Sequence, residues 1–176
     1  MRTIPTVLIL ALTLAMSLAK PSAATAQDTA SPEQMEERGG LVFKSSEQPP
    51  FTGTVQDFHQ SGKPRLEARY EAGKLVSSTV WYDNGQVAEQ VSVVSDTWTI
   101  RRFGDTGRLE EETVARFQDG HKVSEETKRW DEDGRLRTEA GFEKGKLQGP
   151  LKEYDASGNL TRDEVYEQGK LVKKIK

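Results

Sequence analysis

The sequence predicts an all-β fold: a repetitive antiparallel β-hairpin meander, in which about ten strands form one extended single-layer sheet. Three features predict it. Turn glycines recur with spacings of 23, 22, 27 and 24 residues, an aromatic residue precedes each glycine by four, and apolar side chains alternate with charged ones in between. Repeats of this length are typical of proteins whose units are stable only because neighbouring units stack.

Five units of this kind fill the chain, near 51–74, 75–96, 97–121, 122–146 and 147–170, within a repeat domain over 41–176. Their fixed positions are expected to be structural, because every unit needs them equally. The turn glycines are Gly62, Gly85, Gly107, Gly134 and Gly158, and the aromatics are Phe58, Trp81, Phe103, Trp130 and Tyr154.

Within a unit, side chains alternate with a period of two. Leu66, Ala68 and Tyr70 alternate with charged neighbours, which is typical of a half-buried antiparallel strand. Turns such as Asp83-Asn84-Gly85 have hairpin chemistry, since glycine tolerates positive φ. We expect the aromatic and aliphatic stripe on one face of the sheet and the charges on the other.

Three features break the repeat in its second and third units. A second glycine closes the other units, as Gly73, Gly120, Gly145 and Gly169, but Ser95-Asp96 stands there in the second unit. Trp98 lies outside the aromatic pattern, and Phe117 comes ten residues after its turn glycine. We expect any specific site to lie at these breaks.

Residues 1–26 have the pattern of a secretory signal peptide. Arg2 precedes the apolar run Val7–Ala19, and Ala24-Thr25-Ala26 offers small residues for cleavage after Ala26. The run is short for a membrane span, which favours the signal peptide. The alternative is that the segment is retained as an N-terminal anchor. The chain has no cysteine, and disulfide-free export fits a bacterial periplasm or cell surface. The expected location is therefore periplasmic or secreted, with membrane contact not expected after cleavage.

Cleavage would remove Arg2 and Lys20 and move the net charge from −3 to −5. Such a mildly acidic protein is not expected to bind nucleic acid.

Residues 27–40 are expected to be a flexible linker. Ser31-Pro32-Glu33-Gln34 fits a capping box, so one or two helical turns are expected over 32–38.

Catalytic and metal-binding patterns are weak. His59 and His121 lie in different units, so no metal site or cofactor is expected. Asp131-Glu132-Asp133-Gly134 lacks the later ligands of an EF-hand, because Arg135 and Phe142 stand at their places. The pairs within 110–112 and 125–126 offer carboxylates for a hydrolase, but strand alternation favours a solvated, ion-paired face for them.

Four aromatic residues are candidates for binding: Trp81, Tyr82, Trp98 and Trp130. Aromatic side chains stack on sugars and serve as anchors in protein interfaces. The alternative is that they form the core of the sheet, which their repeat positions favour for Trp81 and Trp130.

Gly145-Lys146-Leu147-Gln148-Gly149, followed by Tyr154 and Gly158, resembles the MORN repeat in its bacterial variant form. The chain is similar to proteins grouped as YwqK-type antitoxins. The resemblance implies β-hairpin arrays and a protein partner. The resulting hypothesis is a non-catalytic interaction module or scaffold of the bacterial envelope, with an antitoxin-like or immunity role. The alternatives are a binder of envelope polysaccharide or peptidoglycan through exposed aromatics and, third, a hydrolase with paired carboxylates.

Overall fold

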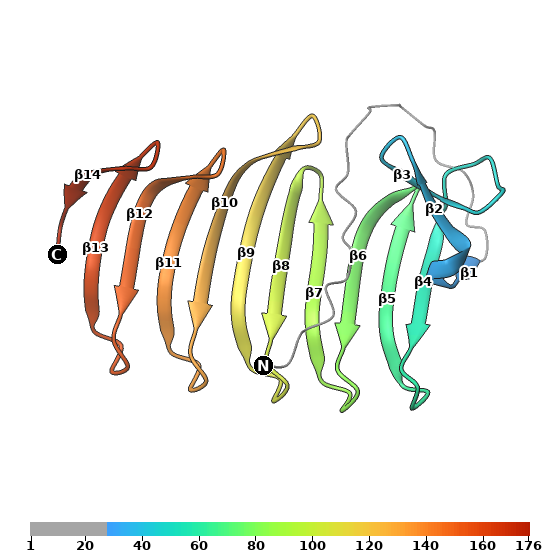
Figure 1. Ribbon diagram of the computed structural model, residues 1–176, viewed down its shortest axis with the longest axis horizontal. Coiled ribbons are helices and arrows are strands. Elements are labelled where there is room, and N and C mark those ends of the chain that lie inside the picture. The colour runs from blue at the N-terminus through green and yellow to red at the C-terminus, as the bar shows by residue number, and fades with distance from the viewer. Residues whose placement is uncertain (1–27) are drawn as a thin grey trace.

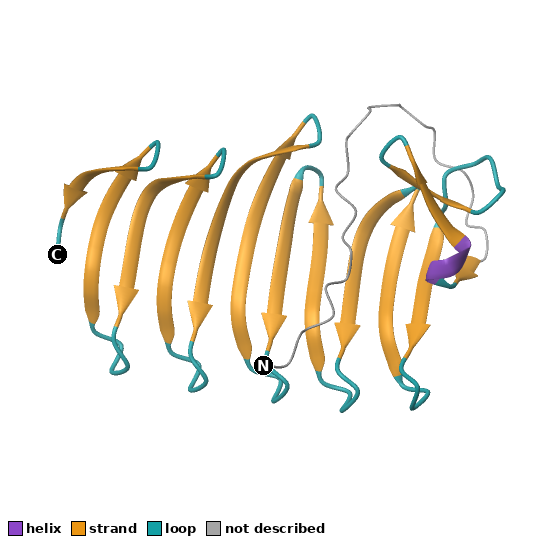
Figure 2. Cartoon of the chain, viewed as in Figure 1, coloured by secondary structure: helices purple, strands orange, loops and turns teal. Residues whose placement is uncertain are grey.

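The computed structural model describes residues 28–176, and these residues confirm the predicted all-β class. One sheet of twelve strands extends without closing on itself, and a separate two-stranded hairpin lies at its N-terminal end (Figures 1 and 2). The predicted signal peptide, 1–26, lies outside the described residues. The elements are β1 Asp28–Ala30, η1 Pro32–Gln34, β2 Met35–Arg38, β3 Leu41–Lys44, β4 Gly53–Phe58, β5 Pro64–Glu71, β6 Lys74–Trp81, β7 Val87–Val94, β8 Thr97–Phe103, β9 Leu109–Gln118, β10 His121–Trp130, β11 Leu136–Glu143, β12 Lys146–Tyr154, β13 Leu160–Glu167 and β14 Lys170–Lys174.

Strands β4 to β14 follow one another in chain order, and each pairs antiparallel with the next. This is the predicted meander. Strand β1 was not predicted, and it pairs parallel with β4, with Asp28 opposite Gly53. A side chain at position 53 would overlap the Asp28 carbonyl, so glycine permits this pairing.

The linker interpretation of 27–40 needs correction, because residues 28–40 form β1, a single 3-10 turn and β2. The capping box holds the turn, since the Ser31 amide donates to Gln34 Oε1 at 2.8 Å. The expected helix stops at Gln34, because Met35 starts a strand that pairs with β3. Met35 also packs on a core cluster, which binds this segment to the sheet. That cluster is Ala30, Phe51, Val55 and Ala68.

The register defines two faces. Cross-strand partners share a face, and adjacent residues on a strand point to opposite faces. One row crosses what we call the core face: Val55, Ala68, Ser78, Val91, Ile100, Thr113, Thr127, Ala140, Leu151 and Glu164. One row crosses what we call the charged face: Gln56, Glu67, Thr79, Gln90, Arg101, Glu112, Lys128, Glu139, Lys152 and Asp163.

The expectation of a single apolar face was wrong. Val80 is buried on the core face, so Trp81 beside it points to the charged face. Tyr154, at the same repeat position, donates its hydroxyl to Glu139 on that face at 2.8 Å. A β-bulge lies opposite each repeat aromatic, and its extra residue reverses the parity on which the expectation relied.

The five turn glycines lie at one end of the sheet, which we call the glycine-turn end, in five turns with the same hydrogen bonds. Each turn spans five residues, of which the glycine is the fourth. The amide of the first residue donates to the carbonyl of the fifth, and the glycine amide donates to the carbonyl of the first. All five glycines have φ between 78° and 89°. Side chains link successive turns, since His59 Nε2 donates to the Trp81 carbonyl at 2.9 Å and Tyr82 Oη to that of Phe103 at 2.8 Å.

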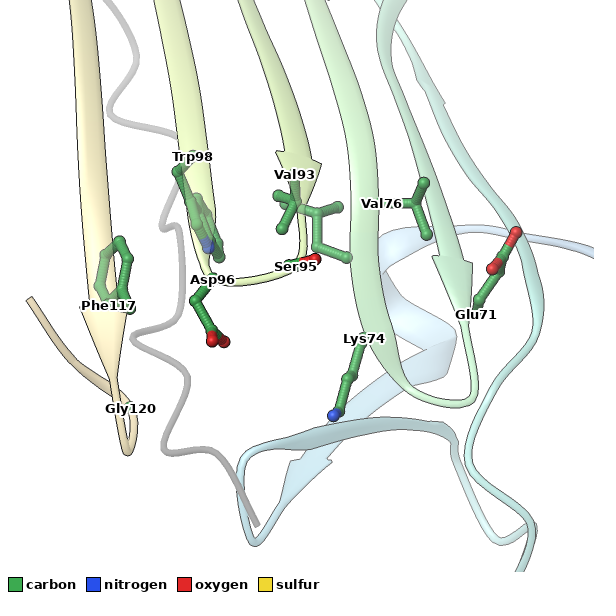
Figure 3. A pocket seen from close by; sticks show the side chains of 10 residues that line it. Glu71, Lys74, Val76, Val93, Ser95, Asp96, Trp98, Phe117 and Gly120 are labelled. Atoms are coloured by element: carbon green, nitrogen blue, oxygen red, sulfur yellow. The ribbon is translucent and has the colours of Figure 1, made fainter. Parts of the chain in front are cut away.

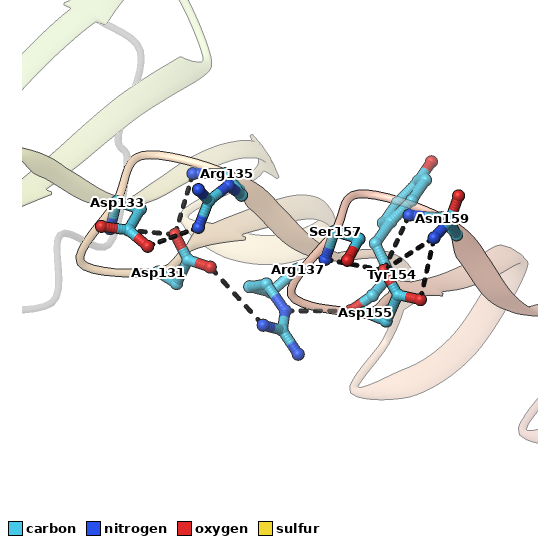
Figure 4. A network of polar contacts seen from close by, with 8 residues as sticks. All are labelled: Asp131, Asp133, Arg135, Arg137, Tyr154, Asp155, Ser157 and Asn159. Atoms are coloured by element: carbon cyan, nitrogen blue, oxygen red, sulfur yellow. Dashed lines mark hydrogen bonds and ion pairs between the residues drawn. The ribbon is translucent and has the colours of Figure 1, made fainter.

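The fourth and fifth glycine turns carry an aspartate at their first position (Figure 4). Asp131 Oδ1 accepts the amides of Asp133 and Arg135, at 3.0 and 2.9 Å. Asp155 Oδ1 accepts those of Ser157 and Asn159, at 2.8 and 2.9 Å. These amide donors stabilise the ionised carboxylates, so the pKa of each aspartate lies below its usual value. The carboxylates therefore hold the turns.

Candidate functional site

The second hairpin, β7–β8, differs from its neighbours at the end opposite the glycine turns, which we call the short-turn end. Here residues 72–73, 95–96, 119–120, 144–145 and 168–169 form two-residue turns. The hairpins β5–β6, β9–β10, β11–β12 and β13–β14 each contain a register shift close to that turn. The β7–β8 ladder has none. Since bulges bend and twist a hairpin, β7–β8 stays straight while the others bend (Figure 1).

The turn residues account for this difference. In the other four turns both residues have positive φ, and the second is glycine, as in Gln168-Gly169 at 50° and 81°. Two successive positive φ values match the right-handed twist of strands. In the β7–β8 turn only Ser95 has positive φ, at 54°. The absence of the second glycine, where the sequence has Ser95-Asp96, therefore changes the geometry of the whole hairpin end.

Three bent hairpin ends reach the chain before them. Lys144 and Gly169 donate their amides to preceding strands, to the carbonyls of Val123 and Leu147, and Gly73 donates to the carbonyl of Phe51, just ahead of β4. Strand β9 runs past the end of β8, and its Phe117 amide donates to the carbonyl of Asp96 in the β7–β8 turn at 2.8 Å.

The β7–β8 turn makes no such bond to β6 within residues 28–176. The β6–β7 ladder begins only at Ser77 opposite Ser92, so among the described residues the edge of β6 over 74–76 has no strand partner on that side. We call this opening the β6–β7 gap.

A cavity of about 400 Å³ lies at the gap (Figure 3). Trp98 is only 8% exposed and forms one wall with Phe117, their ring centroids 5.5 Å apart and their planes 44° apart. Leu75 and Val93 pack against the same cluster. The sequence breaks at Ser95-Asp96, Trp98 and Phe117 thus converge on one cavity.

The charged groups of the cavity lie on its walls. Glu71 and Lys74 come from the β5–β6 side, and Asp96 comes from the β7–β8 turn (Figure 3). Glu71 accepts Arg69 Nη2 at 2.7 Å. Asp96 makes no ion pair within residues 28–176. The walls therefore hold two carboxylates and one ammonium group around an aromatic surface.

A second hollow of about 330 Å³ lies on the core face over β8–β11 and is polar. A ladder of alternating charges crosses this region. Arg102 contacts Glu89 at 2.9 Å and Glu111 at 2.5 Å, and Arg129 contacts Glu111 at 2.8 Å. Both carboxylates of this ladder, Glu89 and Glu111, are therefore paired with arginine.

The other predicted binding residues do not join Trp98. Trp81, Tyr82 and Trp130 are half-buried near the glycine-turn end. Burial and the nearby Glu110 and Asp105 raise the pKa of Tyr82, whose hydroxyl is already bonded to the Phe103 carbonyl. Of the four aromatic candidates, only Trp98 therefore lines the cavity at the β6–β7 gap.

The carboxylate pairs of the hydrolase hypothesis are separated by strand alternation. Glu111 lies on the core face between two arginines, and Glu112 lies on the charged face, 2.7 Å from Arg101. Glu125 lines the second hollow beside Lys122, at 2.6 Å. In the described part of the chain, no group of three or more His, Asp or Glu side chains is placed to hold a metal ion. Nor does any helix in 28–176 have the length and apolar character to cross a membrane.

Comparison with protein-family models gave no match, and comparison with curated proteins gave none either.

Proposed function

We propose that this chain is a non-catalytic interaction module that binds a protein partner. The observation that carries the proposal is the β6–β7 gap, an opening with an aromatic wall beside a hairpin turn that makes no backbone bond to the preceding strand within residues 28–176. Buried aromatic side chains beside a pocket are the usual anchors of protein interfaces. The paired state of Glu111 and Glu112 supports binding over hydrolysis.

Exposure favours protein over polysaccharide as the partner. Sugar stacking needs a free aromatic face, but Trp98 is 8% exposed and forms part of the cavity wall. Trp81 and Trp130 are half-buried at repeat positions. The sequence hypothesis of an envelope location and an immunity or antitoxin-like role fits a partner in the same compartment and forms part of the proposal.

The test is affinity capture from bacterial envelope extract with the chain over 27–176, followed by reconstitution with the purified partner and calorimetry. Stoichiometric binding of one purified protein is the expected result. Binding to purified cell-wall sacculi alone, with no protein partner, would contradict the proposal.

A further inference from the structure

The free edge of β6 is suited to accept another strand. In the described part of the chain, β6 over Lys74–Val76 pairs with β5 on one side only, because the β6–β7 ladder begins at Ser77. Strands with one unpaired edge bind extended peptides through main-chain hydrogen bonds. Within residues 28–176 no other strand pairs with this edge, so a peptide can reach its main-chain groups.

The cavity limits the length of such a peptide. Its volume of about 400 Å³ is at the lower end of the range for ligand pockets. The paired Ser77 and Ser92 close its inner end. Only a few residues of an extended segment fit, so one side chain supplies most of the buried apolar contact.

The side chains on the walls select the chemistry of that segment. Trp98, Phe117 and Val93 offer an apolar surface that suits a branched aliphatic or aromatic side chain. Asp96, beside Trp98 and without an ion pair within 28–176, suits a lysine or arginine next to it. The chain is also acidic overall, with a net charge of −3, which favours basic partners at long range.

We propose that the β6–β7 gap binds an extended segment of a protein partner in which an apolar side chain neighbours a basic one. The segment adds its main chain to β6 over Lys74–Val76, seats its apolar side chain against Trp98 and places its basic side chain beside Asp96. This inference rests on the proposed function and names the site and the partner's chemistry.

The test selects phage-displayed random decapeptides on the chain over 27–176. We expect enrichment of peptides with an aliphatic or aromatic residue beside Lys or Arg. Trp98→Ala and Asp96→Lys should each weaken binding of a selected peptide at least about tenfold, while Trp130→Ala, at a repeat position outside the cavity, should leave its binding unchanged. Selection on Asp96→Lys should shift enrichment toward Asp and Glu.

Two further readouts keep the test decisive. Asp96 is exposed in a turn, so its variant should stay folded even where Trp98→Ala does not. Peptide binding should also slow amide hydrogen exchange in 74–76. No enriched family, or equal binding to wild type and Asp96→Lys, would overturn the inference. If a purified protein partner still binds both gap variants unchanged, the inference fails and the proposed function stands.

Discussion

The β7–β8 and β13–β14 hairpins occupy the same place in their repeats, yet one is straight and the other bends. Gly169 has a φ of 81° and donates its amide to the carbonyl of Leu147 at 2.8 Å, which ties β13–β14 to β12. Ser95-Asp96 lacks that glycine, and the β7–β8 turn makes no bond to β6 within the described residues. A repeat protein can thus open a cavity by omitting one structural residue, without any inserted loop.

The largest effect expected is on the aromatic wall of the gap. Trp98→Ala should lower the free energy of unfolding by about 3 kcal/mol, because Trp98 is buried against Phe117 and Val91. Trp130→Ala should lower the free energy of unfolding by clearly less, since Trp130 is half-buried. Urea denaturation measures both changes. Equal losses would mean that the gap is no more packed than an ordinary repeat position.

A second substitution tests the glycine that the bent hairpins need. Gly73→Ala should cost roughly 2–3 kcal/mol, because its φ is 76° and the new Cβ would lie 2.9 Å from the Val42 carbonyl oxygen. Gly145→Ala, with φ of 77° and open space around it, should cost only about 1 kcal/mol. Thermal unfolding compares them, and the reverse order would rule out this account of the turns.

Acid should destabilise the fourth and fifth glycine turns and leave the stability of the glycine turns that flank β7–β8 unchanged. The pKa of Asp155 is lowered in the fold, chiefly by the Asn159 amide, so its contribution is present above the unfolded pKa of about 3.9 and is lost as pH falls through the folded pKa. The turns on either side of β7–β8 start with Tyr82 and Gly104, which have no carboxylate.

Asp155→Asn keeps an oxygen acceptor but cannot titrate, so unfolding stability should fall less steeply between about pH 4 and pH 2 than in wild type. Denaturant midpoints across that range measure the slope. An unchanged slope would show that Asp155 does not hold its turn through charge.

The smallest effect expected is at Ser95. A serine with φ of 54° is strained, and Ser95→Gly relieves that strain while adding chain entropy to the unfolded state. The net gain should be about 0.5 kcal/mol, read from the thermal midpoint. A loss of stability would show that the turn has a different conformation from the one described.

The fold and the places where the repeat is interrupted could be predicted from the sequence, but the two faces of the sheet and the β6–β7 gap could not. Spacing of Gly62 and its counterparts was sufficient for the meander, because each glycine turn depends on local φ alone. The faces were assigned wrongly, since bulges opposite Trp81 and its counterparts reverse parity without any mark in the sequence.

Trp98, Asp96 and Phe117 were recognised in the sequence as irregular positions, but their convergence on one cavity was not predicted. Their shared cavity depends on how far one hairpin bends relative to the next, which no local pattern encodes. The strand Asp28–Ala30 was missed for a similar reason, because three residues that add parallel to β4 have no periodicity to detect.

Amide hydrogen exchange of the unliganded protein, resolved by residue, tests most directly whether the β6–β7 gap is open. The amides of Lys144 and Gly169, which are bonded to preceding strands, should exchange slowly. Those of Ser95 and Asp96, at the matching turn, should exchange at nearly the rate of an unstructured peptide. Slow exchange at Ser95 and Asp96, equal to that at Gly169, would mean that the sheet is closed there and would contradict the account.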